Sequence, residues 1–104
     1  MSLTIANQYI KARLAGDNNT VLSLVTDDIH FCHQRDGEKD GKREFAKYLE
    51  TTEPQGTWSN AVLQNDETVT ITGKVKLMGF ISIPVKATFE FRGDLINKIS
   101  TKRD

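Results

Sequence analysis

The second half of the chain alternates apolar and polar residues over several segments, and the longest of these runs from Ile81 to Phe91. Side chains of a strand point alternately to its two faces, so this segment predicts a strand with one wholly apolar face. The alternation is repeated from Val69 to Leu77 and from Leu95 to Thr101, and a further strand is expected from Thr57 to Gln64. Together these segments predict an antiparallel sheet.

The first part of the chain shows helical spacing instead. Apolar residues recur at intervals of three and four from Leu3 to Ala15, and Gly16 suits the left-handed residue that follows a helix. Asp17 is a favourable N-cap for a short second helix, which we expect to end in a turn at Asp27-Asp28. A short strand, Ile29–His33, should follow.

A third helix is expected after a polar loop, Asp36–Gly41. Phe45, Tyr48 and Leu49 would share its apolar face, and it should end near Glu53, because Pro54 disfavours a helical conformation in the preceding residue.

Helices followed by grouped strands predict an α+β fold, with the helices on one face of a curved antiparallel sheet. Gly73 and Pro84 interrupt the strand patterns, so we expect a bulge or bend at Gly73 and a bulge or an unpaired edge at Pro84. A sheet bent in this way around helices forms a cone, and such cones hold small ligands.

Composition excludes several other classes. The 104 residues are enough for one domain, 1–104, and the 14 basic and 14 acidic side chains give a net charge of zero. That balance argues against binding to nucleic acid or to a membrane surface. No apolar run could span a membrane, and Met1–Thr4 does not resemble a signal peptide. The single cysteine, Cys32, fits a reducing compartment, so we expect a cytoplasmic protein.

His30, Cys32 and His33 raise the question of a metal site. Alternation places His30 and Cys32 on one face of the predicted strand and His33 on the other, whereas zinc needs three or four converging ligands. We therefore expect no metal. No glycine-rich phosphate loop is present, so no cofactor is expected either.

Three segments resemble a known group of proteins. Tyr9–Asp17 followed by Val21–Ile29 resembles an aromatic-bearing helix, Gly-Asp, a hydrophobic helix and Asp-Asp, and Gly41–Leu49 is similar to the third helix of the same group. This group is the NTF2-like superfamily, which includes SnoaL-like cyclases and ketosteroid isomerases. The resemblance covers essentially the whole chain and implies an NTF2-like cone of three N-terminal helices on a curved antiparallel sheet. The superfamily also contains ligand binders and interaction modules, so the fold does not settle the function.

The ketosteroid isomerases allow a comparison residue by residue. Tyr9 matches the tyrosine that hydrogen-bonds the developing oxyanion, and His33 stands where that family has its aspartate base. The family's protonated aspartate has no counterpart near Lys86, Ala87 and Thr88. The resemblance therefore argues against ketosteroid isomerisation but leaves a Tyr9/His33 acid–base pair.

Each candidate has an alternative interpretation. His33 is either a general base inside the pocket or a histidine at its mouth that hydrogen-bonds the Asp36–Gly41 loop. Tyr9 is either a proton donor or an amphipathic core residue. Trp58 either forms a pocket wall or packs on the third helix. The predicted pocket lining is Phe31, Trp58, Ile81, Val85, Ala87 and Phe89.

Two functions are compatible with these residues. The first is binding of a small apolar carbonyl compound, with SnoaL-like isomerase or cyclase chemistry in which His33 is the base and Tyr9 the oxyanion partner. The second is a non-catalytic ligand carrier or protein-interaction module. In either case the polar strand face of Thr68, Thr70, Thr72, Lys74 and Lys76 is a candidate homodimer interface, as the resemblance implies.

Overall fold

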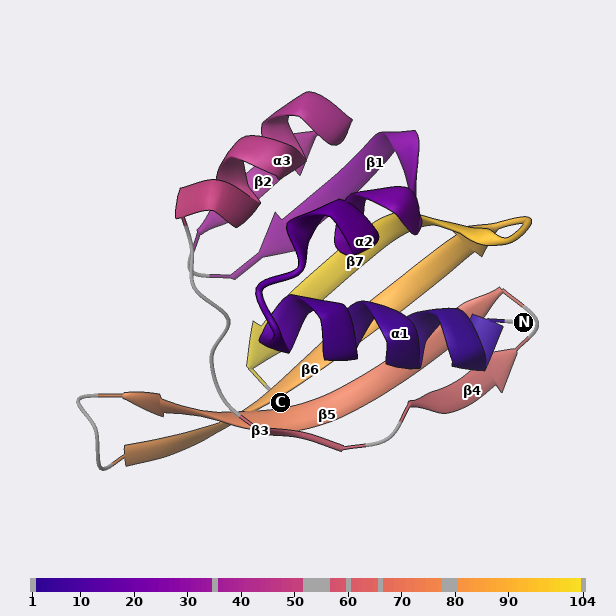
Figure 1. Cartoon of the computed structure of the whole chain (residues 1–104). Helices are drawn as coiled ribbons and strands as arrows, with labels where there is room; N and C mark the ends of the chain where they lie inside the picture. The colour runs from indigo at the N-terminus through magenta and orange to yellow at the C-terminus, as the bar shows by residue number, and fades with distance from the viewer. Residues whose placement is uncertain are drawn as a thin grey trace.

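The computed structural model describes residues 2–34, 36–51, 57–59, 61–65, 67–77 and 81–103. These residues form three α-helices and seven β-strands (Figure 1), so the predicted α+β class is correct. In chain order the elements are α1 (Ser2–Leu14), α2 (Asn18–Ser23), β1 (Val25–His33), β2 (Gly37–Asp40), α3 (Lys42–Thr51), β3 (Thr57–Trp58), β4 (Val62–Asn65), β5 (Thr68–Leu77), β6 (Ile81–Arg92) and β7 (Leu95–Arg103). Of the described helices, α1 and α2 precede the first strand and α3 follows β2, so the expectation of three N-terminal helices holds only for the first two.

The junction between α1 and α2 is formed as the sequence predicts. Gly16 has a φ of 74°, and the Asp17 N–H reaches back to the carbonyl of Ala12 at 2.9 Å, which closes the end of α1. The Asp17 carboxylate then accepts a hydrogen bond from the Thr20 N–H at 3.2 Å and caps α2. Together these contacts reverse the chain and lay α2 beside α1.

The turn predicted at Asp27-Asp28 is wrong. Helix α2 ends at Ser23, and both aspartates lie within β1, which already begins at Val25. The physical reason is that Val25 is buried and pairs with Ile96 of β7, so the chain joins the sheet before the acidic pair.

The sheet is mixed rather than antiparallel. Its order is β2-β1-β7-β6-β5-β3, with β4 also paired to β5. Strands β5, β6 and β7 form antiparallel pairs, but β1 runs parallel to β7. The helical segment that precedes β1 delivers it beside the last strand of the sheet, so the prediction of a purely antiparallel sheet is wrong. The predicted Asp36–Gly41 loop is also largely a strand, because β2 folds back and pairs with β1 from Gly37 to Asp40.

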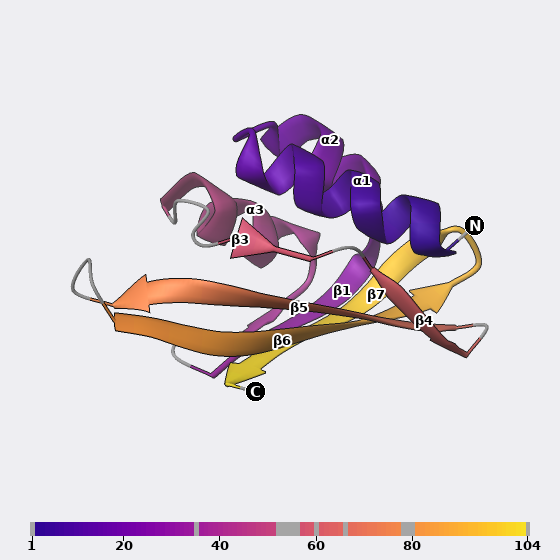
Figure 2. The same ribbon diagram turned by 90° about the horizontal axis from the view of Figure 1, so that it is seen from below.

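All three helices lie on one face of the curved sheet, called here the helix-covered face (Figures 1 and 2). The opposite face carries no helix within the described residues and is called the open face. The core lies between the helices and the sheet, and its largest fully buried side chains are Phe45, Phe89, Ile29, Ile71, Ile96 and Ile99. None of the helices in this part of the chain is long and apolar enough to cross a membrane.

The pairing of β5 and β6 has no bulge at Gly73. Their register is continuous from Thr68↔Glu90 to Leu77↔Ile81, so the bulge predicted at Gly73 is wrong. A Cβ at this position would lie 2.7 Å from the indole of Trp58, which shows that the glycine makes room for β3. The bulge in the long strand lies instead between Glu90 and Phe91.

Pro84 pairs regularly with Lys74 on the β5 side, so β5 and β6 have no bulge there; on the β7 side the described residues end opposite Val85, and the predicted unpaired edge stays a prediction. The segment predicted as one strand from Thr57 to Gln64 forms two short strands, β3 and β4. The turns predicted at Asn65–Glu67 and at Met78-Gly79, and the helix end near Glu53, involve residues outside those described.

Candidate functional site

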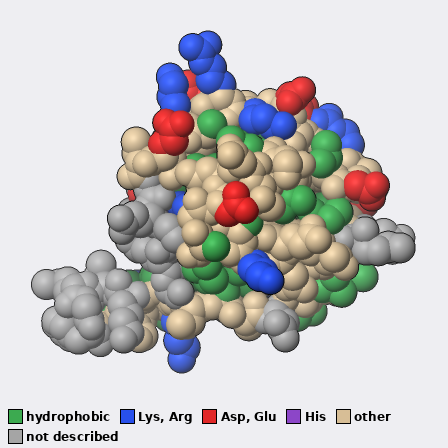
Figure 3. All heavy atoms as spheres, in the orientation of Figure 1, with side chains coloured by type: hydrophobic (Ala, Val, Ile, Leu, Met, Phe, Trp, Pro, Cys, Tyr) green, Lys and Arg blue, Asp and Glu red, His purple; other side chains and the backbone are tan. Residues whose placement is uncertain are grey.

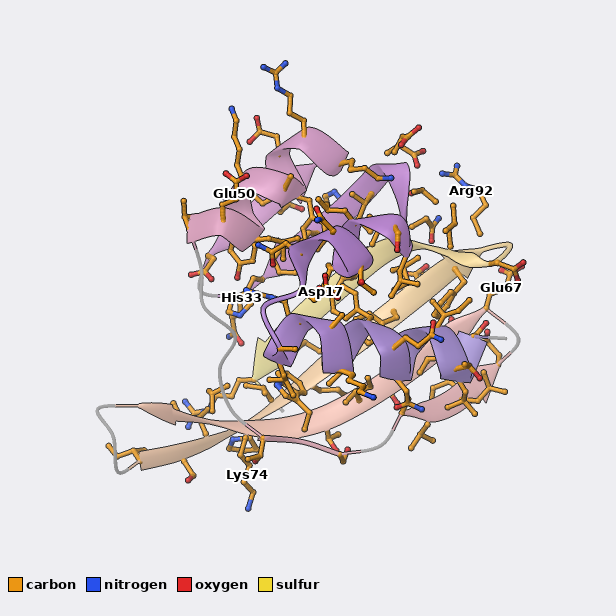
Figure 4. The ribbon with its side chains drawn as sticks, in the orientation of Figure 1. Asp17, His33, Glu50, Glu67, Lys74 and Arg92 are labelled. Carbon is orange, nitrogen blue, oxygen red and sulfur yellow. The ribbon has the colours of Figure 1, made fainter. Side chains whose placement is uncertain are left out.

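His33 is the last residue of β1 and lies on the helix-covered face (Figure 4). Its partner in β7 is Thr101, whose other neighbour, Ala87 of β6, is buried beneath the helices. The imidazole is stacked against the buried ring of Phe31, with centroids 6.2 Å apart. About a quarter of the His33 side chain is exposed (24%), so the imidazole is both anchored by the core and accessible from outside.

Asp36 and Tyr48 complete a cluster around His33. The Asp36 N–H donates to His33 Nδ1 at 3.3 Å, and the Asp36 carboxylate lies 3.7 Å from the same nitrogen. The Tyr48 hydroxyl, from α3, donates to Asp36 Oδ2 at 2.7 Å. A helix, a loop and a strand thus meet in one hydrogen-bonded group, called here the His33 cluster (His33, Asp36 and Tyr48).

This geometry distinguishes the two imidazole nitrogens. Nδ1 faces Asp36, and Nε2 points away from that contact. Asp36 offers Nδ1 a donor, its N–H, and a nearby acceptor, its carboxylate, so either neutral tautomer of His33 has a partner. The contact of His33 with the start of the Asp36–Gly41 segment is the one expected for a histidine at the mouth of the cone.

Tyr9 lies deeper, on α1. It is buried, and its ring meets Phe89 edge to face with centroids 5.2 Å apart. Burial raises the pKa of the Tyr9 hydroxyl far above its usual value, and nearby Arg13 opposes this effect only in part. Tyr48 is near enough to interact electrostatically with Tyr9. Tyr9 is therefore a neutral hydrogen-bond donor at any physiological pH, and it belongs to the core.

The residues predicted to line a pocket fall into two groups. Phe31, Ala87 and Phe89 are buried members of the core, and the Phe31 ring lies 4.7 Å from that of Tyr48 and 5.3 Å from that of Phe45. Trp58 and Val85 are half-buried, and Ile81 is 43% exposed. The role of these six residues as a pocket lining stays a prediction.

An open groove of about 560 Å³ lies on β3, β5 and β6, away from the strand that carries His33. It is lined by Thr57, Trp58, Ser59, Thr72, Gly73, Lys74 and Pro84, so Trp58 is the one predicted lining residue that contributes to it. Figure 3 shows that basic and acidic side chains are interspersed over the visible helix-covered side.

His30 and Cys32 lie on the open face, opposite to His33, as the alternation predicts. His30 Nδ1 is paired with Asp40 and Nε2 with Glu38 at 3.1 Å, so hydrogen bonds to these carboxylates raise the pKa of His30, the Asp40 bond most strongly. No group of three His, Cys, Asp or Glu side chains within the described ranges is arranged to hold a metal ion.

No family model and no curated protein matches the chain. Its structure, however, is similar to many solved structures. An NTF2-like protein of unknown function from Cytophaga hutchinsonii superposes with a TM-score of 0.82 at 11% identity, over 96% of this chain and 87% of that one. A provisionally assigned polyketide cyclase from Pseudomonas putida gives 0.77 at 20% identity, over 100% and 92% of the two chains. A provisionally assigned ketosteroid isomerase from Kribbella flavida gives a TM-score of 0.82 at 12% identity, over 98% of this chain and 76% of that one.

The chain has the NTF2-like fold. At these identities the likeness establishes the fold and leaves the activity of this NTF2-like chain to be argued from its site.

Two members of the His33 cluster do not stand out in the sequence of this NTF2-like chain. The residue pattern places Asp36 in an exposed loop and Tyr48 on the apolar face of a helix. The spacing of His33 and Asp36 is a local signal that the two could meet across a turn. No linear pattern indicates that α3 places the Tyr48 hydroxyl over Asp36, because that contact depends on how the helix packs on β1 and β2.

Proposed function

We propose that this NTF2-like protein binds a small apolar carbonyl compound beside the His33 cluster and moves a proton on it through His33. The observation that carries the proposal is the hydrogen-bonded cluster itself, half-buried against the ring of Phe31. An imidazole has an ordinary pKa close to neutral pH, which suits both removal and return of a proton.

Asp36 would support both steps. With Nδ1 accepting from the Asp36 N–H, Nε2 carries the proton and donates to a carbonyl oxygen. With Nδ1 protonated toward the Asp36 carboxylate, Nε2 would accept a proton from the carbon beside that carbonyl. The Tyr48 hydroxyl holds the carboxylate in place for this second state.

Tyr9 would serve as a hydrogen-bond donor to the developing oxyanion. Its buried, neutral hydroxyl suits that role, because a preorganised donor in a low-dielectric site stabilises charge more than one in water does. The chemistry would differ from that of the ketosteroid isomerases. In the stretch where that family has its protonated aspartate, the residue on the helix-covered face is Ala87. The polyketide cyclase and isomerase names of two structural neighbours are consistent with carbonyl chemistry on this fold.

Exchange of solvent deuterium into the methyl group of 2-acetonaphthone tests this proposal. Wild type should accelerate exchange, His33→Ala should lose the acceleration, and His30→Ala should keep it, because His30 lies on the open face. Equal exchange rates for wild type and His33→Ala would remove His33 from the mechanism.

A ligand carrier without catalysis is the second candidate. It is favoured by the ring contacts among Tyr9, Phe31, Phe89 and Tyr48, which occupy the middle of the space between sheet and helices. A carrier predicts that 2-acetonaphthone shifts resonances of the His33 cluster in NMR spectra while its deuterium exchange stays at the uncatalysed rate.

We also propose that the open face pairs two copies of the chain. Small side chains follow one row across its strands, Thr70, Thr88, Ser100 and Cys32, and would let a second sheet approach closely. Sedimentation should show a dimer for wild type and a monomer for Ser100→Arg. Ser23→Arg, which changes an exposed residue of α2 on the other side of the sheet, is the control and should stay a dimer. A monomeric wild type at high concentration would exclude this interface.

A further inference from the structure

Basic residues gather on the helix-covered face beside His33. Arg103 follows Thr101, the partner of His33, on the same face of β7. Lys39 of β2 is the partner of Phe31 on this face, and its Nζ lies 3.4 Å from the Asp36 carbonyl. Arg13 of α1 is near enough to the Tyr9 hydroxyl to lower its pKa. Strands β2 and β7 therefore each bring a cation next to the strand that carries His33.

The acidic side chains described on β2 and just before it have other partners. Asp36 accepts the Tyr48 hydrogen bond and faces His33. Glu38 and Asp40 point to the open face, where they pair with His30. Among the described residues no carboxylate forms an ion pair with Arg103. Arg103 is therefore able to pair with an anionic ligand.

Arg103 also ends an apolar row across the sheet. Its partner in β6 is Val85, the partner of Val85 in β5 is Gly73, and Gly73 is covered by the indole of Trp58. Val85 and Trp58 are half-buried, so both retain surface that a ligand can contact. Two strand spacings, about 10 Å, separate Gly73 from Arg103. The row therefore offers an aromatic wall at one end, an aliphatic floor, and a guanidinium at the other end.

We infer that the ligand of this site is an aromatic carboxylate, bound with its acid group on Arg103 and its rings over Val85 toward Trp58. The inference deepens the proposed function and rests on it, since Arg103 follows Thr101, the β7 partner of His33, and would hold the acid group beside the His33 cluster. The planar guanidinium of arginine matches a carboxylate with two parallel hydrogen bonds, and this geometry distinguishes an acid from a ketone of the same shape.

Two probes of nearly equal shape test the inference: 2-naphthoate, and 2-acetonaphthone, in which a methyl group replaces one carboxylate oxygen. Their dissociation constants are measured on the full chain by NMR titration in low-salt buffer. Wild type should bind 2-naphthoate at least about fivefold tighter, as expected for a charge-assisted contact. This preference should shrink when salt is added.

Three variants identify the cation. Arg103→Gln should remove the preference for 2-naphthoate and leave 2-acetonaphthone binding unchanged. Lys102→Gln is the matched control, because the adjacent residue lies on the open face, and it should keep the preference. A loss in Lys74→Gln instead would place the acid in the groove around Pro84 and overturn the inference.

The outcomes separate this inference from the proposed function. Equal binding of the two probes to wild type, or an Arg103→Gln variant that keeps the preference, overturns the inference alone, because 2-acetonaphthone still reports on the His33 site. Failure of both probes to bind overturns the inference and the proposed function together.

Discussion

Replacing Gly73 with alanine should destabilise the protein, although the same change in most strands is stabilising. A new Cβ would lie 2.5 Å from the Thr57 carbonyl oxygen and 2.7 and 2.8 Å from two indole carbons of Trp58. Ordinary contacts begin near 3.4 Å, so a backbone oxygen has to retreat by about 0.9 Å. Overpacking of this kind costs about 2 kcal/mol. For a chain of 104 residues that corresponds to a fall in Tm of about 9 °C.

Thermal unfolding followed by circular dichroism measures this effect, and the emission of the single tryptophan, Trp58, reports the local displacement. Without the contact, alanine would raise stability by about 0.4–1 kcal/mol, because it restricts the unfolded chain more than glycine does. The sign of the change is therefore diagnostic. Trp58→Ala in the same background should rescue only part of the loss, since the Thr57 oxygen stays in place. An unchanged or raised Tm for Gly73→Ala would refute the packing of β3 on β5.

Three further predictions concern single side chains. Replacing His30 with glutamine should lower stability near pH 5.5 and have little effect near pH 9. The reason is that the raised pKa of His30 contributes stability below about pH 6.5, and this stability is lost as pH rises through the folded-state pKa. Equal losses at both pH values in urea unfolding would contradict this. Tyr48→Phe removes the hydroxyl that hydrogen-bonds Asp36. It should slow deuterium exchange into 2-acetonaphthone severalfold and lower the free energy of unfolding by about 1 kcal/mol. An exchange rate equal to wild type would exclude a positioning role for Tyr48. Asp17→Ala should lower Tm at neutral pH, whereas Asp17→Asn should preserve it, because asparagine also caps a helix. Equal Tm values for the two variants would contradict the capping contact.

Patterns local to one element were predictable from the sequence. Three such features depend on neighbours close in the chain, and the structure shows each of them. They are the end of α1 before Gly16, the N-cap at Asp17 and the position of His33 on the helix-covered face. The parallel pairing of β1 with β7 was not predictable in this way, since it joins residues at opposite ends of the chain. Gly73 shows the same limit: its pattern indicated an irregularity, but only the position of Trp58 explains it.

The candidate site was predictable only in part for the same reason. Alternation placed His33 on the helix-covered face, and the resemblance to the NTF2-like superfamily indicated Tyr9. Asp36 and Tyr48 come together with His33 through packing of α3 on β1 and β2, which no periodicity encodes. The prediction of a turn at Asp27-Asp28 was wrong because β1 begins earlier, at the buried Val25, than the turn-forming residues indicated.

In the proposed function, ligands bind at His33 and not at the chain's other histidine. Both imidazoles can be followed by NMR while 2-acetonaphthone is titrated into the full chain, with His33→Gln and His30→Gln assigning the two sets of signals. The proposed site predicts that the ring signals of His33 shift with saturation while those of His30, on the open face beside Asp40, stay in place. Shifts confined to His30, or none at either ring at millimolar ligand, would contradict it.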